Sequence, residues 1–260
     1  MHGQFRRGGL NWQLDLNEGI DFAIYLLGAF ERDLMLSYQR LIAPGATVLD
    51  IGANIGAHTL PLAKHVGPNG RVIAIEATAF AYAKLQENLS LNSELIAQTT
   101  LTQALLTASD SAPTETAIQS SWPLVDGEAV HDMTCGAPKS TIGAKTCTLD
   151  TLLAELSLQQ VDWIKLDVDG HELTVLQGSR KCLETYRPTI FMELAPYCYQ
   201  DGSSDFADMV KILTSRDYDL FRLPSLTLLP QSAALLVKDE IPSKGSINIL
   251  AKPRAKPLSQ

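Results

Sequence analysis

Residues 48 to 56 read Val48-Leu49-Asp50-Ile51-Gly52-Ala53-Asn54-Ile55-Gly56. An apolar run leads into an acid and closely spaced glycines, and a helical stretch follows at 58–64. This order predicts a strand, a tight loop and a helix, because glycine permits a sharp turn and the close approach of a ligand. The loop reads D-x-G-x-N-x-G and lacks the dinucleotide pattern G-x-G-x-x-G, and a carboxylate at Asp50 would repel a pyrophosphate. We therefore expect a cationic or zwitterionic ligand at Asp50, Gly52, Asn54 and Gly56.

A second apolar strand, 71–76, also ends in an acid, Glu76, which Ala77 follows. Glu76 lies about 20 residues beyond the glycine loop, the spacing at which an acid binds ribose hydroxyls in nucleotide-binding α/β units. A ligand with a ribose, no phosphate and a positive centre is S-adenosylmethionine. Gln103 and Ala104, in a third strand at 99–106, would then lie beside the adenine. In the alternative interpretation, the glycines serve only the turn of a βαβ unit.

The composition favours one α/β domain with a full core, since the chain has 260 residues, of which 45% are hydrophobic and 19% charged. The net charge of −8 argues against nucleic acid and against anionic membrane surfaces as partners. The four cysteines form no C-x-x-C pair, which argues against a zinc site and for reduced thiols. Because no signal-peptide pattern opens the chain and the longest apolar run, 22–30, is short, we expect a cytoplasmic protein.

Strand and helix patterns alternate along the chain, which predicts a mainly parallel sheet with helices on both faces and a ligand at the carboxyl ends of the strands. Residues 107–146 are rich in small and polar residues, and we expect short strands or an ordered loop that shapes an acceptor pocket. The predicted strands are 10–16, 46–51, 71–76, 99–106, 161–166, 188–194, 219–223, 233–237 and 246–252, and the predicted helices are 33–43, 56–66, 79–92, one opening at 148, one from the 167–172 loop to 183, and 204–216.

Candidate catalytic groups also lie at the carboxyl ends of the predicted strands. Methyl transfer to an alcohol needs a base to remove the hydroxyl proton, and His171 is the best-placed neutral base in the sequence. Asp167, Asp169, Glu172 and Glu193 could orient His171 or take the proton themselves. We assign Asp167, His171 and Glu193 to this chemistry, with Asp167 also facing the cofactor. In the alternative interpretation, His171 is an ordinary helix-start residue and the loop before it only a turn. These oxygens could hold Mg²⁺ or Ca²⁺, but the spacing favours no metal site and we assign no ligands. Glu31 is a candidate lid acid over the cofactor.

Four stretches of the chain resemble one known family. The glycine loop at 50–60, the stretch 164–172 with 175–178, the strand 188–193 and the upstream element 28–31 are similar to signatures of the FkbM family of S-adenosylmethionine-dependent methyltransferases. The resemblance covers roughly residues 15 to 200. It implies a class I methyltransferase (Rossmann-like) fold, a doubly wound sheet of seven strands with the last antiparallel. It also implies methyl transfer to a hydroxyl of a small molecule, sugar or other secondary metabolite.

The chain departs from that family in two places. Asp169 stands where relatives usually carry Glu, and His171 stands where they often carry a small residue, so the role of His171 rests on local chemistry alone. Gln103 replaces the adenine-side acid of the wider methyltransferases. We expect a cover segment at 1–45, a methyltransferase domain at 46–252 and a disordered tail at 253–260.

Three other functions stay in view. A catalytically silent methyltransferase-like subunit that binds a partner is the main alternative. An NAD-dependent oxidoreductase is disfavoured by the missing third glycine and by the acid at Asp50. A nucleic-acid methyltransferase is disfavoured by the charge and by the absence of an N-P-P-[aromatic] or D-P-P-[aromatic] tetrapeptide. The sequence leaves the acceptor and the oligomeric state open.

Overall fold

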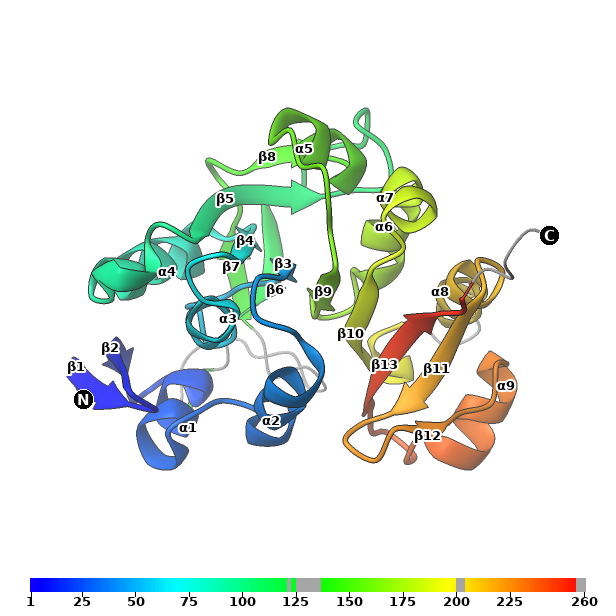
Figure 1. Cartoon of the computed structure of the whole chain (residues 1–260), viewed down its shortest axis with the longest axis horizontal. Helices are drawn as coiled ribbons and strands as arrows, with labels where there is room; N and C mark the ends of the chain where they lie inside the picture. The colour runs from blue at the N-terminus through cyan, green and yellow to red at the C-terminus, as the bar shows by residue number, and fades with distance from the viewer. Residues whose placement is uncertain (121–122, 125–136, 200–203, 256–260) are drawn as a thin grey trace.

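The structure is a computed structural model that describes residues 1–120, 123–124, 137–199 and 204–255 (Figure 1). Within these residues a central sheet has the strand order β12-β11-β13-β10-β9-β3-β4-β5-β8. Its strands are β3 (Thr47–Ile51), β4 (Arg71–Glu76), β5 (Thr99–Leu106), β8 (Lys145–Cys147), β9 (Trp163–Leu166), β10 (Thr189–Leu194), β11 (Tyr218–Arg222), β12 (Thr227–Leu228) and β13 (Ile247–Pro253).

The directions of the strands confirm the predicted doubly wound sheet. β3 pairs in parallel with β4 and β9, and the outer pairs β4–β5 and β9–β10 are also parallel. β13 lies between β10 and β11 and runs antiparallel to both. The last long strand is therefore the antiparallel one, as in the class I methyltransferase fold. Two short edge strands, β8 and β12, extend the expected seven strands to nine.

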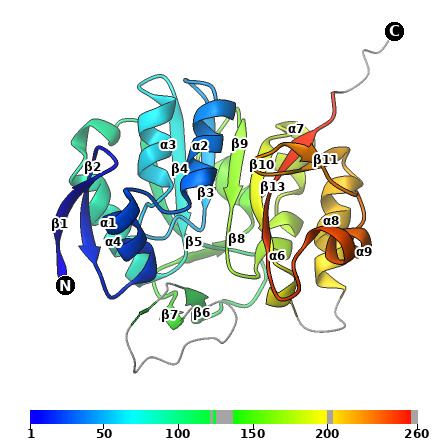
Figure 2. The same cartoon turned by 90° about the horizontal axis from the view of Figure 1, so that it is seen from below.

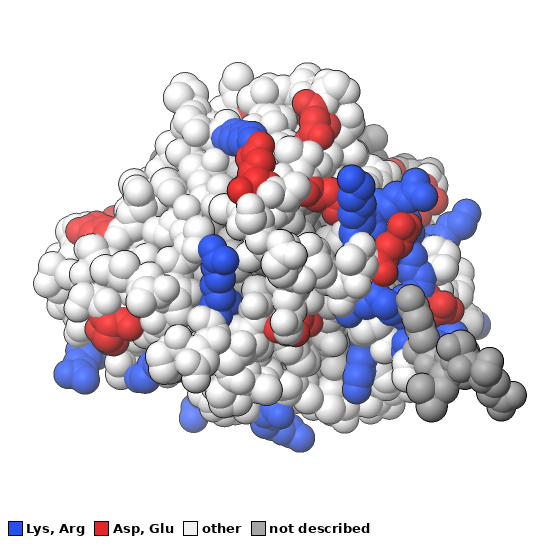
Figure 3. Space-filling model, turned by 45° about the horizontal axis from the view of Figure 1, so that its top comes forward, with Lys and Arg blue, Asp and Glu red and all other residues white. Residues whose placement is uncertain are grey.

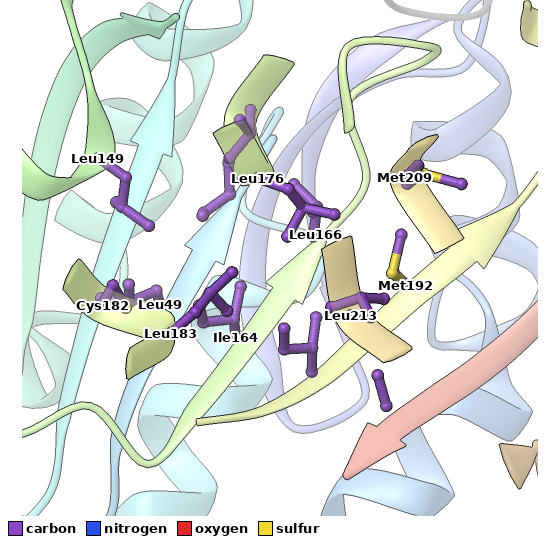
Figure 4. Close-up of a cluster of buried hydrophobic side chains, with 14 of the residues drawn as sticks. Leu49, Leu149, Ile164, Leu166, Leu176, Cys182, Leu183, Met192, Met209 and Leu213 are labelled. Atoms are coloured by element: carbon purple, nitrogen blue, oxygen red, sulfur yellow. The ribbon is translucent and has the colours of Figure 1, made fainter. Parts of the chain in front are cut away.

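The helices cover both faces of the sheet (Figure 2). Neighbouring residues of one strand serve opposite faces, because side chains alternate along a strand. Leu49 packs with α5 (Leu149–Glu155), α6 (Glu172–Gln177), α7 (Arg180–Thr185) and α8 (Asp205–Thr214) in the larger core cluster (Figure 4). Val48 packs with α2 (Arg32–Leu41) and α3 (Thr59–Val66) on the other face. α4 (Ala79–Ser90) follows β4 and contacts β5.

Two predicted elements are wrong. Residues 233–237, predicted as a strand, form α9 (Ala233–Leu235) and the start of a π-helical turn (Leu236–Glu240), since a short apolar run does not distinguish a buried strand from a helical turn. The single helix predicted up to residue 183 is divided into α6 and α7. The break lies at Gly178, where a Cβ atom would lie only 2.2 Å from the backbone oxygen of Thr107.

The N-terminal segment contains more structure than the sequence indicated. The strand at 10–16 and the helix at 33–43 correspond to β2 (Leu10–Asp15) and α2, but β1 (His2–Arg7) and α1 (Gly19–Leu27) were not predicted. β1 pairs with β2 in an antiparallel hairpin and alternates only between exposed and half-buried residues, so it carries no strong hydrophobic period. The division into a cover segment and a domain stays a prediction.

Two asparagines, Asn88 on α4 and Asn92 just after its end, bind the edge of the hairpin. The Asn88 side chain accepts a hydrogen bond from the backbone N–H of Gln13 at 2.7 Å. One turn later, Asn92 accepts from the N–H of Asn11 at 2.9 Å and donates to its carbonyl at 2.7 Å. Both amides are fully buried. They take the place of a neighbouring strand, because they hydrogen-bond backbone groups at the edge of β2.

The stretch at 107–146 contains short strands, as predicted. β6 (Ala117–Ser120) pairs antiparallel with β7 (Ala137–Ser140), and β8 joins the main sheet. Residues 121–122 and 125–136 of this stretch, and most of the predicted tail, lie outside the described residues. In the described part of the chain, no helix has the length and apolar character to cross a membrane.

The loop after β3 and the loop after β9 touch at a glycine. Gly52 has φ +78°, and a Cβ atom there would lie 1.8 Å from the backbone oxygen of Asp167. The N–H groups of Gly52 and Ala53 both donate to the carbonyl of Ile75 at 3.0 Å, which fixes the loop on β4. Only glycine therefore allows the two loops to meet.

We expect Gly52→Ala to lower the free energy of unfolding by at least about 3 kcal/mol, because the added methyl group would force the two loops apart. Gly45→Ala is the matched control, since Gly45 has φ +87° but no atom within 4 Å of its added Cβ. The control should lose only the backbone cost of about 1 to 2 kcal/mol. Urea denaturation of both variants measures the difference, and equal losses would contradict this account.

Candidate active site

A cavity of about 400 Å³ lies at the carboxyl ends of β3, β4, β9 and β10. Its walls come from strand ends, from the segment between α1 and α2, and from β6 and β13. Nine of the predicted site residues line this cavity: Glu31, Gly52, Asn54, Glu76, Ala77, Ala104, Asp167, His171 and Glu193.

Three predicted cofactor residues do not line the cavity. Asp50 is fully buried behind the wall, where it accepts a hydrogen bond from the Thr59 hydroxyl at 2.5 Å. Gly56 packs against the core, and a Cβ atom there would lie only 2.8 Å from the side chain of Leu85. Gln103 donates to the carbonyl of Ile142 at 3.1 Å. A direct contact of these three residues with a cofactor stays a prediction.

Lys165, which interrupts the apolar strand β9, belongs to the site although the sequence pattern did not predict it there. Its side chain is 3% exposed and its ammonium donates to the carbonyl of Gly52 at 2.9 Å. Asp167 lies 3.3 Å from the ammonium, and Asp50 lies 3.6 Å away as a charge contact. Burial disfavours the ammonium, but the neighbouring carboxylates outweigh this and raise the pKa of Lys165. The sequence did contain a signal for Lys165, because a lysine within an otherwise apolar strand must have a partner for its charge.

Glu76 organises the glycine loop as well as the cavity wall. One carboxylate oxygen accepts from the N–H of Asn54 at 2.9 Å, and the other accepts from the N–H and hydroxyl of Thr78 at 2.8 and 2.7 Å. Burial raises the pKa of Glu76, while these hydrogen bonds oppose the rise. Glu76 therefore combines a structural role with a position from which it can accept hydrogen bonds from a ligand.

The loop from Asp167 to Glu172 presents acids at the cavity. Glu172 does not line it and instead secures the loop, because it accepts from the N–H of Val168 at 3.0 Å and of Gly170 at 3.2 Å. Asp169 lines the cavity with φ +49°, and burial together with the nearby Asp167, Glu172 and Glu193 carboxylates raises its pKa to about 8. His171, at the start of α6, also lines the cavity.

Glu193 closes β10 and faces the same space. Burial raises its pKa to about 7, and the carboxylates of Asp167 and Glu31 add to the rise. Its hydrogen bond with the Ser246 hydroxyl opposes that rise without cancelling it. A carboxylate with this pKa can accept a proton near neutral pH.

Glu31 reaches the cavity from between α1 and α2. Its carboxylate lies 3.1 Å from Nε2 of His58 and accepts from the Asn248 amide at 3.2 Å. Burial by itself would raise the pKa of Glu31, but His58, Lys165 and Asn248 together lower it to about 2. Neither His58 nor Asn248 was predicted, because no local pattern links residues 58 and 248 to residue 31.

Among the described residues, no group of three or more His, Cys, Asp and Glu side chains has an arrangement that could hold a metal ion. The acids that line the cavity differ from one another in their hydrogen-bond partners and in the charges beside them.

Neutralising Glu193 should change how stability depends on pH. Because the pKa of Glu193 is raised on folding, wild-type protein binds this proton more tightly than the unfolded chain and loses stability as pH rises from about 4.5 to about 7. We expect Glu193→Gln to be more stable than wild type at pH 8 by on the order of 1 kcal/mol, and to gain nothing at pH 4.

Urea denaturation at both pH values measures this effect. Glu94→Gln, an exposed acid on the turn Ser93–Leu95 that does not line the cavity, is the control and should behave like wild type. The same stability difference for Glu193→Gln at both pH values would contradict the assignment.

The chain is similar in sequence or structure to known methyltransferases. An arsenite methyltransferase of Halobacterium salinarum is 41% identical over 51 residues, which is 20% of this chain and 13% of that protein. A solved methyltransferase FkbM from Methylobacillus flagellatus KT aligns with 81% of this chain and 44% of its own, at 17% identity and a TM-score of 0.49. This chain thus spans less than half the length of both relatives.

A structure from Clostridium thermocellum, of a protein proposed to be an rRNA methylase, aligns with 86% of this chain and 95% of its own, at 15% identity and a TM-score of 0.50. This likeness concerns the fold alone. The family model described as "Methyltransferase FkbM domain" matches residues 50–220, more than half of the chain, and this range includes the glycine loop, Lys165, the acids after β9 and Glu193 near the end of β10. The chain belongs to the FkbM methyltransferase family.

Proposed function

We propose that this chain transfers a methyl group from S-adenosylmethionine to a hydroxyl of a small molecule, sugar or secondary metabolite. The observation that carries the proposal is the charge of the cavity. Five carboxyl groups line it, from Glu31, Glu76, Asp167, Asp169 and Glu193, whereas Lys165 is the one Lys or Arg among the described lining residues.

An excess of carboxylates fits the proposed donor. S-adenosylmethionine carries a sulfonium and an ammonium group, so acids around it stabilise the bound state. Lys165 already neutralises part of the charge of Asp50 and Asp167, and Glu31, whose pKa is lowered by His58, Lys165 and Asn248, remains an ionised acid. A ligand that carries phosphates would meet repulsion in the same cavity.

The remaining walls fit a nucleoside. Glu76 at the end of β4 offers carboxylate oxygens to ribose hydroxyls, as the spacing of the sequence predicted. Apolar surface from Ala104, Leu106 and Ile118 lies on the β5 and β6 side, where a flat base can be buried. Gln103 lies outside the lining, so we expect adenine to be recognised by apolar contact and backbone groups.

The acceptor side offers bases near neutral pH. When bound, the donor supplies a methyl group on a positively charged sulfur, and the attacking alcohol must lose its proton. Glu193 fits this task because its pKa is about 7, and His171 and Asp167 line the same space. We assign proton removal to Glu193, with His171 and Asp167 orienting the acceptor hydroxyl.

Binding of the donor is the first test. Isothermal titration calorimetry of the whole chain should give a dissociation constant in the micromolar range, roughly −7 to −8 kcal/mol. Glu76→Gln should weaken binding by about tenfold or more, because a charged acceptor for the ribose hydroxyls is lost. Glu87→Gln, on the exposed side of α4, is the matched control and should bind like wild type.

Circular dichroism must show that both variants fold, since Glu76 also holds backbone groups of the glycine loop. Failure of folded wild-type protein to bind S-adenosylmethionine would refute the proposal. Wild-type affinity in a folded Glu76→Gln variant would refute the ribose assignment alone.

Transfer is the second test, in which radiolabelled S-adenosylmethionine is incubated with a library of alcohols, sugars and amines. For an acceptor that is methylated, Glu193→Gln should lower the rate by about 100-fold or more at pH 7 while donor affinity changes little. His171→Gln should have a smaller effect. A larger loss in His171→Gln than in Glu193→Gln would move the base to His171, and nitrogen-only methylation across the library would refute O-methyl transfer.

A further inference from the structure

Glu31 joins three separate parts of the chain at the cavity. Its backbone connects α1 to α2, its Oε2 lies 3.1 Å from Nε2 of His58 at the start of α3, and its Oε1 accepts from Nδ2 of Asn248 in β13 at 3.2 Å. We call these three residues the Glu31 clasp. The cavity is lined by all three.

The clasp is fixed from behind by a second layer. His58 is 3% exposed, and its Nδ1 lies 3.3 Å from the hydroxyl of the buried Tyr38. Nδ1 of His58 faces the Tyr38 hydroxyl and Nε2 faces the Glu31 carboxylate, so each ring nitrogen has a polar neighbour. The rings of Phe30 and Tyr38 contact His58 edge-on, which restricts rotation of the imidazole.

The backbone of Glu31 also indicates a constrained position. Its φ is +44°, in the left-handed region that side chains other than glycine, asparagine and aspartate seldom occupy. Such a conformation is strained and persists where surrounding contacts hold it. Here the contacts to His58 and Asn248 direct the carboxylate toward the cavity.

The charge of Glu31 differs from that of its neighbours. The pKa of Glu31 is lowered to about 2, while burial and neighbouring carboxylates raise those of Glu193 and Asp169. The charged or titratable groups that act on Glu31 are His58 from α3 and Lys165 from β9, and Glu31 in turn acts on Glu193 and Tyr38. Glu31 therefore stays ionised at every pH at which the protein would work.

We propose that His58 and Asn248 are positioning residues that hold the carboxylate of Glu31 against the positively charged part of the donor. This inference rests on the proposed function. It assigns roles to an imidazole and an amide that lie 3.1 and 3.2 Å from the carboxylate of Glu31, and it makes the N-terminal segment a direct part of the donor site. In this proposal both residues act on the donor through the carboxylate of Glu31.

The test compares a charged ligand with an uncharged one on the whole chain. The ligands are S-adenosylmethionine and 5′-deoxy-5′-methylthioadenosine, which shares the nucleoside but carries no positive charge. Calorimetry of Glu31→Gln, His58→Leu and Asn248→Ala should show about tenfold, fivefold and threefold weaker binding of S-adenosylmethionine. Binding of the uncharged nucleoside should stay within twofold of wild type in all three.

A double variant separates positioning from packing. If His58 acts through Glu31, the variant with both Glu31→Gln and His58→Leu should bind S-adenosylmethionine as Glu31→Gln alone does. His58→Gln, which keeps a side-chain donor, should recover most of the affinity that His58→Leu loses. His65→Leu is the matched control, because His65 lies on the same helix and bonds to the carbonyl of Ile42 but does not line the cavity.

The outcomes are distinct. Equal losses of affinity for both ligands, or losses that multiply in the double variant, would contradict the proposed role of the Glu31 clasp. They would not contradict the binding of S-adenosylmethionine by the chain. A wild-type chain that binds the uncharged nucleoside but not S-adenosylmethionine would refute the proposed function itself. Thermal unfolding of each variant shows which ones are folded, and Asn248→Ala keeps the test decisive if His58→Leu does not fold.

Discussion

A buried ammonium group joins the two loops on which the site is built. Lys165 is fixed in β9, yet it donates to the carbonyl of Gly52 and lies between the carboxylates of Asp50 and Asp167. Removing those partners would leave a charge inside the sheet, at a cost of several kcal/mol. The loops after β3 and β9 are thus held together, at the point where Gly52 touches the backbone of Asp167.

The acids of the cavity differ in the direction of their pKa shifts. His58, Lys165 and Asn248 lower the pKa of Glu31 to about 2, although burial opposes this. Burial and neighbouring carboxylates raise the pKa of Asp169 to about 8 and that of Glu193 to about 7. Acids that stay ionised suit a cationic ligand, and acids that can take up a proton suit base catalysis. On the surface, Lys and Arg side chains gather on the right of the face shown in Figure 3, with Asp and Glu side chains among them.

The order of elements was predictable because each depends on residues close together in the sequence. The alternation of β3, α3, β4 and α4 followed from periodicity and turn residues, and the acids at the ends of β3, β4, β9 and β10 followed from the run of each strand. The errors have local reasons too: β1 carries no apolar period, and the run at 233–237 is too short to distinguish helix from strand.

By itself, the sequence determined the doubly wound fold, the rim on which the site lies and nine of the residues that line the cavity. Only the tertiary structure decided that Asp50 lies behind the wall, that Lys165 neutralises it, and that Glu31 meets His58 and Asn248. The physical reason is distance along the chain. Strand periodicity acts over a few residues, whereas burial, ion pairing and pKa depend on side chains that come together from positions as far apart as 31 and 248.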